Sequence, residues 1–167
     1  MRCSIRPFDI NDSAELAEVL NNKKVLDNLR DGLPFPYTEA DAKEYIRFVQ
    51  NTAKDNAYVF AITADNRVVG NIGAFRQTNI HSKTAELGYY LAEPYWNQGV
   101  MTDAVKQFCD LLFANTDIIR LFAEPFAENI GSCRVLEKNG FVCEGTLRQN
   151  AVKNGKILDM KMYAKIR

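Results

Sequence analysis

The segment from Ala85 to Ala104, AELGYYLAEPYWNQGVMTDA, predicts a strand, a sharp turn and the start of a helix. Asn97, Gln98 and Gly99 stand where extended backbone must become helical, and glycine permits the backbone conformations that such a turn requires. The first N–H groups of a helix lack intrahelical partners and lie at the positive end of its dipole. The turn therefore predicts a phosphate site, and a nucleotide-like cofactor is the first hypothesis.

The length and charge of the chain limit the alternatives. Its 167 residues suit a single domain, 1–167, with its own core. The formal net charge of +0 gives no general attraction to nucleic acid. No apolar run approaches the roughly 20 residues of a membrane span, and the start lacks the features of a secretory signal. We therefore expect a cytoplasmic protein without nucleic-acid or membrane partners.

The four cysteines do not predict a metal site or a disulfide framework, because they lack both CxxC spacing and a histidine cluster. Cys133, beside Arg134, is a weak candidate nucleophile because His81 is the only histidine that could serve it as a base. We interpret His81 itself as a solvated loop residue. No metal is expected.

Apolar periodicity predicts an α+β domain with about seven strands and about four helices. A short strand around Ile5 and Phe8 precedes a helix capped by Asp12 with Glu15, and a second helix begins at Thr38 with Asp41. The other predicted strands cover residues 57–63, 68–77, 83–91, 118–124, 141–152 and 156–166, and the other predicted helices follow residues 99 and 129.

Local signals add detail to this prediction. The strands over residues 57–63 and 68–77 are expected to join at Asp65-Asn66, and Asn154-Gly155 predicts a tight hairpin turn. Residues 29–37 are expected to form an exposed loop. The buried stripe of the helix that follows Gly99 is expected to contain Met101, Ala104, Val105, Phe108, Leu111 and Leu112.

Four strings occur in this order along the chain: LPFPYTEADA at 33–42, AELGYYLAEPYWNQGVMTDA at 85–104, ENIGSCRVLEKNGF at 128–141, and EGTLRQN at 144–150, followed by NGK and Asp159. Together they resemble the ribosomal-protein N-acetyltransferase (RimJ/RimL) branch of the GNAT acetyltransferase superfamily. The resemblance covers nearly the whole chain. It implies the GNAT fold, with a mixed and mostly antiparallel central sheet, and acetyl-CoA as co-substrate.

The resemblance also implies which residues hold the cofactor. Backbone near Leu91 and Glu93 would pair with the pantetheine arm. The pyrophosphate would bind the turn made by Gln98, Gly99, Val100, Met101 and Thr102. Met101 stands where the family usually has a small residue, so its side chain is expected to point into the core.

The second helix start supplies further candidates. In the family, the residue matching Asn129 contacts the pantetheine arm and that matching Ser132 reaches towards the sulfur. Asn129 and Ser132 also have the spacing of a simple helix cap. Leu136 occupies the position of the usual tyrosine acid, so Ser132 or water is the candidate acid.

Glu86 matches a strand glutamate that acts as general base in some family members, and its alternative is a structural, salt-bridged glutamate. The implied activity is direct transfer of an acetyl group to a primary amine in a ternary complex. A protein or peptide N-terminus, such as that of a ribosomal protein, is the first acceptor hypothesis. The alternatives are a small amine (polyamine, amino sugar, amino acid or antibiotic) or a non-catalytic acyl-CoA sensor. The sequence does not distinguish these acceptors, nor a monomer from a homodimer.

Overall fold

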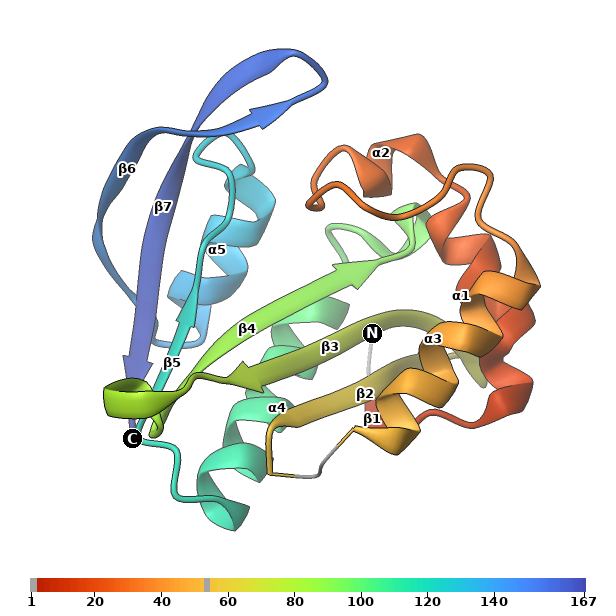
Figure 1. Cartoon of the computed structure of the whole chain (residues 1–167), viewed down its shortest axis with the longest axis horizontal. Coiled ribbons are helices and arrows are strands. Elements are labelled where there is room, and N and C mark those ends of the chain that lie inside the picture. Colours follow the sequence, from red (N-terminus) through yellow and green to blue (C-terminus); the bar gives the residue numbers. More distant parts are fainter. Residues whose placement is uncertain (1–2, 53–54) are drawn as a thin grey trace.

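The computed structural model of the chain describes residues 3–52 and 55–167. Over these residues, seven strands form one sheet in the order β1-β2-β3-β4-β5-β7-β6, with five α-helices arranged around it (Figure 1). The strands are β1 (Ser4–Arg6), β2 (Ala57–Ala64), β3 (Arg67–Arg76), β4 (Thr84–Leu91), β5 (Arg120–Ala123), β6 (Val142–Lys153) and β7 (Lys156–Ile166). The helices are α1 (Ser13–Leu20), α2 (Lys23–Leu26), α3 (Glu39–Asn51), α4 (Val100–Asn115) and α5 (Ile130–Lys138). The mixed, mostly antiparallel sheet confirms the predicted fold class.

The sheet opens between β4 and β5. These two strands run parallel, and they pair only where residues 84–86 lie opposite residues 120–122. Beyond Glu86, β4 continues to Leu91, whereas β5 ends at Ala123. Figure 1 shows the two strands diverging from this point. The second half of β4 therefore has a neighbour, β3, on one side only.

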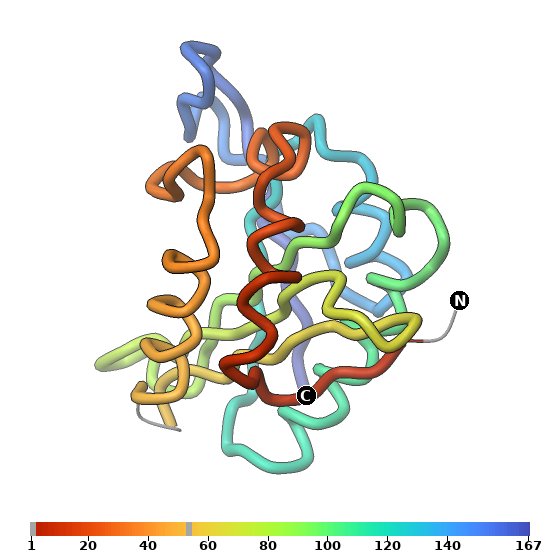
Figure 2. The backbone as a smooth tube through the Cα atoms, turned by 90° about the vertical axis from the view of Figure 1, so that its right-hand side faces the viewer, coloured from red at the N-terminus to blue at the C-terminus, as the bar shows by residue number. Residues whose placement is uncertain are grey.

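Two hydrophobic cores lie on the two faces of the sheet. Alternate residues of β2 divide between them, with Ile62 in the core shared with α4 and α5, and Ala61 in the core shared with α1 and α3. Phe108 of α4 and Ile46 of α3 are fully buried in these respective cores. Figure 2 shows α1 and α3 side by side on their face of the sheet. Both faces of the sheet are thus covered by packed cores.

Both predicted hairpin turns are confirmed. Asp65 and Asn66 join β2 to β3 with φ angles of 52° and 60°, and Asn154 and Gly155 join β6 to β7 with φ angles of 51° and 73°. Two successive positive φ angles define the type I′ turn, which matches the twist of antiparallel strands. Local turn chemistry was therefore sufficient to locate these connections.

The predicted cap at Asp12 is wrong. The cap forms one turn earlier, where Asp9 accepts from the Asn11 N–H and Asp12 accepts from the Asp9 N–H at 2.8 Å. The Asp12 carboxylate also accepts two hydrogen bonds from Arg6, at 2.7 and 2.8 Å. Because Arg6 holds this carboxylate, α1 begins without a side-chain cap. The second predicted cap is confirmed, since Thr38 and Asp41 bond each other reciprocally.

Three smaller expectations also change. The one-turn helix α2 was not predicted, although the Asn22 side chain caps it by accepting from the Lys24 N–H at 2.9 Å. Leu111 is 36% exposed, and Cys109 occupies the buried stripe of α4 in its place. Residues 29–37 do form a largely exposed loop, but its last residue, Tyr37, is buried, and its backbone N–H donates to the Asn21 side chain.

Candidate functional site

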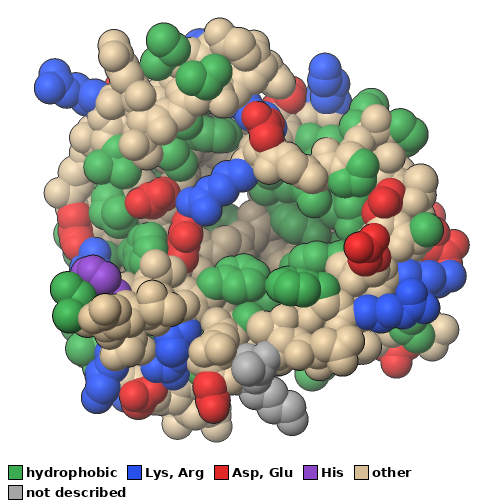
Figure 3. Space-filling view, viewed as in Figure 1, with side chains coloured by type: hydrophobic (Ala, Val, Ile, Leu, Met, Phe, Trp, Pro, Cys, Tyr) green, Lys and Arg blue, Asp and Glu red, His purple; other side chains and the backbone are tan. Residues whose placement is uncertain are grey.

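The opening between β4 and β5 widens into a cleft of about 880 Å³. This volume is in the range of small-molecule and cofactor sites. The cleft is lined on one side by the first turn of α4 and by α5, and on the other by the chain after α2, by β3 and by the end of β5. Figure 3 shows a hollow on this face of the molecule, with charged side chains beside it. The cleft therefore reaches elements on both faces of the sheet.

One edge of β4 is directed into the cleft. The Ala92 N–H donates to the Val69 carbonyl on β3 at 2.7 Å. The carbonyl of the preceding residue, Leu91, accepts instead from the indole of Trp96 at 2.7 Å. Backbone groups alternate in direction along a strand, so those of Tyr89 also point away from β3. This edge can pair with an extended ligand arm, as an added strand would.

Two of the predicted cofactor residues lie away from the cleft lining, which includes Leu91 but neither Glu93 nor Gln98. Glu93 begins the 3-10 turn η3 (Glu93–Tyr95), and its carboxylate binds Lys24 and Asn22 near α2. The Gln98 side chain donates to the Pro94 carbonyl at 2.5 Å. The side chains of both residues therefore stabilise the segment that precedes Gly99.

The turn before α4 has the geometry that the sequence predicted. Gly99 has a φ of +80°, a left-handed conformation that glycine adopts at low cost. The first intrahelical bond of α4 runs from the Asp103 N–H to the Gly99 carbonyl, so the N–H groups of Val100, Met101 and Thr102 precede that ladder. Together with Gly99, these three residues line the cleft. Their free N–H groups and the helix dipole can hold a phosphate group there.

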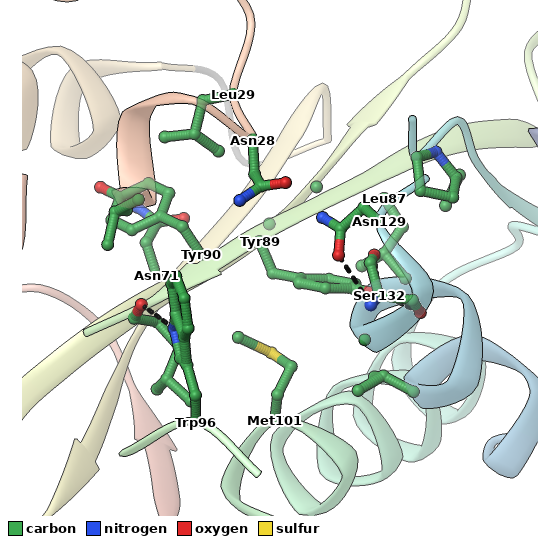
Figure 4. Close-up of a pocket in the computed structure, with 18 of the residues that line it drawn as sticks. Asn28, Leu29, Asn71, Leu87, Tyr89, Tyr90, Trp96, Met101, Asn129 and Ser132 are labelled. Carbon is green, nitrogen blue, oxygen red and sulfur yellow. Dashed lines mark hydrogen bonds between the residues drawn. The ribbon is translucent and has the colours of Figure 1, made fainter. Parts of the chain in front are cut away.

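The Met101 side chain meets its expectation only in part, because it is buried but also lines the cleft. It is 8% exposed and belongs to the core shared with α4 and α5. In Figure 4 its side chain rises from α4 into the lower part of the cleft, between Trp96 and Ser132. Met101 therefore packs against the core and also forms part of the cleft lining.

Asn129 and Ser132 form the predicted pair at the start of α5. The Asn129 side chain accepts from the Ser132 N–H at 3.1 Å, which is the helix cap. The Ser132 hydroxyl lies 2.9 Å from the hydroxyl of Tyr89, on β4 (Figure 4). Burial raises the pKa of Tyr89 far above its usual range, so its hydroxyl stays protonated. Leu136, at the position of the usual tyrosine acid, is fully buried.

Glu86 lies on the other side of the cleft and is ion-paired. Its carboxylate accepts from Arg30, in the loop after α2, and the same guanidinium nitrogen lies 3.6 Å from the Glu124 carboxylate. Glu86 lies on β4 and Glu124 directly follows β5, and these are the two strands that diverge. Arg30 therefore bridges the opening of the sheet.

Sequence reasoning missed three residues of the site: Tyr89, Arg30 and Glu124. Strand alternation carried a signal for Tyr89, because it placed Tyr89 on the opposite face from Glu86. No local pattern indicated Arg30 or Glu124. Their partners lie far away in sequence, and only the fold brings them together.

Other chemistries find little support among the described residues. Burial raises the pKa of the Cys133 thiol, which disfavours a thiolate nucleophile. Residues 3–52 and 55–167 contain no group of three or more histidine, cysteine or acidic side chains placed to hold a metal ion. None of the helices in these ranges is both long and apolar enough to cross a membrane.

Comparison with known proteins decides the family. Residues 2–142 match the profile of the acetyltransferase (GNAT) domain. The chain belongs to the GNAT acetyltransferase family. It is 30% identical over 165 residues to the probable N-acetyltransferase YjcK of Bacillus subtilis (strain 168), covering 96% of this chain and 91% of that protein. It is 27% identical over 149 residues to the ribosomal-protein-serine acetyltransferase of Escherichia coli (strain K12), covering 89% and 83% of the two chains.

A solved structure supports the same assignment. The chain superposes with a TM-score of 0.86 on RimL, a ribosomal L7/L12 alpha-N-protein acetyltransferase in complex with coenzyme A. The two are 25% identical, and the match covers 98% of this chain and 93% of RimL. The GNAT protein described here is therefore an N-acetyltransferase that uses acetyl-CoA, and the fold predicted from the resemblance is confirmed.

Proposed function

We propose that this GNAT enzyme acetylates the α-amino group of a protein or peptide N-terminus by direct transfer in a ternary complex. The observation that carries the proposal is the cleft, which reaches Ser132 on one side of β4 and Glu86 on the other. An acceptor and a donor entering from the two sides would meet at the unpaired edge of β4. Cys133, which follows Ser132, is buried and does not line the cleft, so the site supports transfer without a covalent enzyme intermediate.

The residues that would hold acetyl-CoA fit that group. The N–H groups of Val100, Met101 and Thr102 provide donors for the pyrophosphate, and the positive φ of Gly99 leaves the backbone open there. The edge of β4 that faces away from β3, with the backbone groups of Tyr89 and the N–H of Leu91, suits the amides of the pantetheine arm, whereas the Leu91 carbonyl is already bonded to Trp96. When bound, acetyl-CoA supplies the acetyl group as a reactive thioester.

Asn129 and Ser132 complete the site on the cofactor side. The Asn129 side chain orients the first turn of α5 by its bond to the Ser132 N–H. The Tyr89 hydroxyl lies 2.9 Å from Ser132 Oγ and 3.3 Å from the Ser132 carbonyl oxygen. When Tyr89 donates its proton to the nearer acceptor, Ser132 Oγ, the serine proton is free to be directed into the cleft. Ser132 is then the group that delivers a proton to the departing sulfur, and Tyr89 is its positioning residue.

Glu86 is assigned the role of accepting a proton from the attacking amine. Its side chain is 26% exposed, so a solvent molecule or an amine can reach the carboxylate. An ionised carboxylate at this place attracts an ammonium group and can accept its proton, directly or through water. The ion pair with Arg30 does not exclude this role, because an exposed pair is worth only about 0–1 kcal/mol.

The acceptor assignment draws on two relatives. RimL acts on ribosomal L7/L12 and the Escherichia coli relative is a ribosomal-protein-serine acetyltransferase, as their names state. An α-amine also needs less help from a base than a lysine amine, because its pKa is about 8 rather than about 10.4. A single carboxylate base is therefore adequate for this acceptor.

The test is an acceptor panel with acetyl-CoA, in which release of the free thiol is followed over time. The panel contains a short peptide with a free N-terminus, the same peptide N-acetylated, a polyamine, an amino sugar and a free amino acid. We expect fastest turnover of the free peptide and none of its acetylated form. Turnover of a small amine alone would show that the acceptor is a small molecule and not a peptide N-terminus. Without turnover of any amine, acyl-CoA binding would be left as the activity.

A further inference from the structure

Two carboxylates share a single guanidinium at the mouth of the cleft. Arg30 donates to Glu86 and lies 3.6 Å from Glu124. The Glu86 and Glu124 side chains are 26% and 21% exposed, whereas that of Arg30 is 66% exposed. The anions are thus fixed in the wall of the opening, while the cation reaches them from outside.

This unequal burial makes Arg30 replaceable. A mostly exposed arginine gives up little free energy when it returns to water, since exposed ion pairs contribute little to stability. Two neighbouring carboxylates left without a partner would repel each other, and their partial burial limits their solvation, so they favour any cation that takes the place of Arg30. The pair therefore selects a cationic group.

A second hollow adjoins the main cleft at Arg30. It measures about 250 Å³ and shares Arg30, Asp31 and Glu124 with the main cleft. Its remaining wall comes from the β6–β7 hairpin and the chain after β5, and includes Phe126, Ala151 and Met160. Arg30 consequently stands between the two spaces.

The loop that carries Arg30 is itself anchored to the hairpin. Lys153 Nζ lies 2.7 Å from the Asp31 carboxylate, and the Asn154 side chain donates to Asp27 at 2.9 Å. The loop is thus anchored at Asp27 and Asp31, on both sides of Arg30, and the Arg30 side chain lines both hollows between these anchors.

We propose that the ammonium group of the acceptor takes the place of the Arg30 guanidinium between Glu86 and Glu124. The substituent of the amine then extends into the hollow beneath the hairpin, along Phe126, Ala151 and Met160. Glu124 is a specificity residue for a cationic head group, and Arg30 competes with the acceptor for the same anions. This inference rests on the proposed amine acetylation, but it concerns binding and not turnover.

The test compares two arginine variants by calorimetry on the CoA-loaded enzyme. The probes are a tetra-alanine amide with a free α-amine, its N-acetylated form and 1,4-diaminobutane. Arg30→Gln is expected to tighten binding of the amine probes by about threefold or more, because it removes the internal competitor. Arg67→Gln is the matched control, since Arg67 forms an exposed ion pair with Glu15 on α1, away from the cleft.

A third variant tests the anions. Glu124→Gln is expected to weaken binding of the amine probes by about tenfold while leaving CoA affinity and the acetylated peptide unchanged. Thermal unfolding of all three variants checks that each one is folded. Amine binding that is unchanged, weakened or absent in folded Arg30→Gln overturns the inference.

The inference and the proposed function fail separately. If only the diamine is bound and acetylated, the peptide acceptor is wrong, while tighter diamine binding by Arg30→Gln still upholds the place of the ammonium. If the peptide is acetylated and Arg30→Gln binds it no better, the proposed function stands and the role of Arg30 is wrong.

Discussion

The hydroxyl of Tyr89 lies 2.9 Å from the hydroxyl of Ser132, and this contact joins β4 to α5 across the floor of the cleft. The two residues are 43 positions apart in sequence. Both the strand and the helix are held by the same hydrophobic core, which fixes the separation of the two hydroxyls. A serine hydroxyl that would otherwise rotate freely thus has a defined hydrogen-bond partner.

Removing the tyrosine hydroxyl tests whether this contact orients Ser132. Tyr89→Phe is expected to lower kcat by about tenfold without changing the KM for acetyl-CoA, because the proton on Ser132 loses its direction. Ser132→Ala should have a similar effect, and the double variant should be little worse than either single one. Steady-state kinetics of the three variants measure this coupling.

Tyr163→Phe is the matched control for that experiment. Tyr163 is buried, and its hydroxyl donates to Glu137 on the same helix, α5, at 2.8 Å, but Tyr163 does not line the cleft. An equal loss of kcat in Tyr163→Phe would mean that α5 is merely loosened. Fully additive losses in the Tyr89 and Ser132 double variant would show that the two hydroxyls act independently.

The phosphate role of the turn before α4 is tested at Gly99. An added Cβ at Gly99 meets no atom within 4 Å, so the cost of Gly99→Val lies in its positive φ. A β-branched residue disfavours that conformation by about 1–3 kcal/mol, and relaxation of the turn would misalign the N–H groups of α4. We expect CoA affinity, measured by calorimetry, to fall by a comparable free energy.

Gly140→Val gives the comparison. Gly140 has a φ of +78°, an added Cβ there also meets no atom within 4 Å, and Gly140 does not line the cleft. It should therefore lose a similar amount of stability and keep its CoA affinity. A folded Gly99→Val variant that binds CoA as tightly as the wild type would remove the turn from the phosphate site.

Glu86→Gln separates a base from a structural partner of Arg30. The amide keeps the shape of the side chain and can still accept from Arg30, but it cannot take up a proton. We expect kcat at neutral pH to fall by about 10²-fold, and the loss to shrink as pH rises and more of the acceptor is already neutral. Glu144→Gln, which breaks the ion pair between Glu144 on the outer strand β6 and Arg120 on β5, should leave kcat unchanged. If the kcat of Glu86→Gln equals that of the wild type at every pH, Glu86 is excluded as the base.

The Arg6–Asp12 pair predicts a pH-dependent contribution to stability. Burial raises the pKa of Asp12, but hydrogen bonds from Arg6 and the Asp9 N–H outweigh it, so the net pKa lies below 3.8. A carboxyl whose pKa is lowered by folding stabilises the protein above its unfolded pKa, and that contribution is lost as pH falls below 3.8 through the folded value. Asp12→Asn should therefore lower the free energy of unfolding by about 1–3 kcal/mol at neutral pH and by less in acid.

Denaturant titrations at several pH values measure this difference. Asp110→Asn is the control, because its ion pair with Lys106 is an exposed i,i+4 contact worth about 0.5 kcal/mol or less. A difference between wild type and Asp12→Asn that does not change with pH would mean that the ionised carboxylate is not what stabilises this corner.

The features that were predictable from sequence are those whose cause is local. The turn at Gly99 and the hairpin at Asn154-Gly155 each need positive φ angles within a few residues, and the residue types announce that need. The prediction of a cap at Asp12 failed because this carboxylate has more than one local partner. Arg6 donates to the Asp12 carboxylate, and a short-range sequence pattern cannot show whether this carboxylate will bind Arg6 or the first turn of α1.

The contacts that were not predictable join distant segments. Arg30 comes from a loop without regular structure, and its partner Glu86 is 56 positions away. The identity of that partner depends on how far β4 and β5 diverge, which is a property of the whole sheet. The resemblance to a family located Glu86 and Ser132 by their motifs. It gave no indication of Tyr89 or Glu124, because their roles depend on the contacts that they make in the fold with Ser132 and Arg30, respectively.

The acceptor class provides the last prediction. An α-amine with a pKa of about 8 is roughly one-tenth neutral at pH 7, whereas a lysine amine with a pKa of about 10.4 is neutral in fewer than about one molecule in a thousand. With Glu86 as its single carboxylate base, the enzyme should therefore acetylate the N-terminus of a peptide faster than a lysine in the same peptide. Mass spectrometry of a peptide that carries both groups locates the added acetyl group, and a peptide with a blocked N-terminus serves as the control. Raising the pH should narrow the preference, because the neutral fraction of lysine grows more steeply. Preferential labelling of the lysine at neutral pH would contradict the N-terminal assignment and leave the GNAT assignment intact.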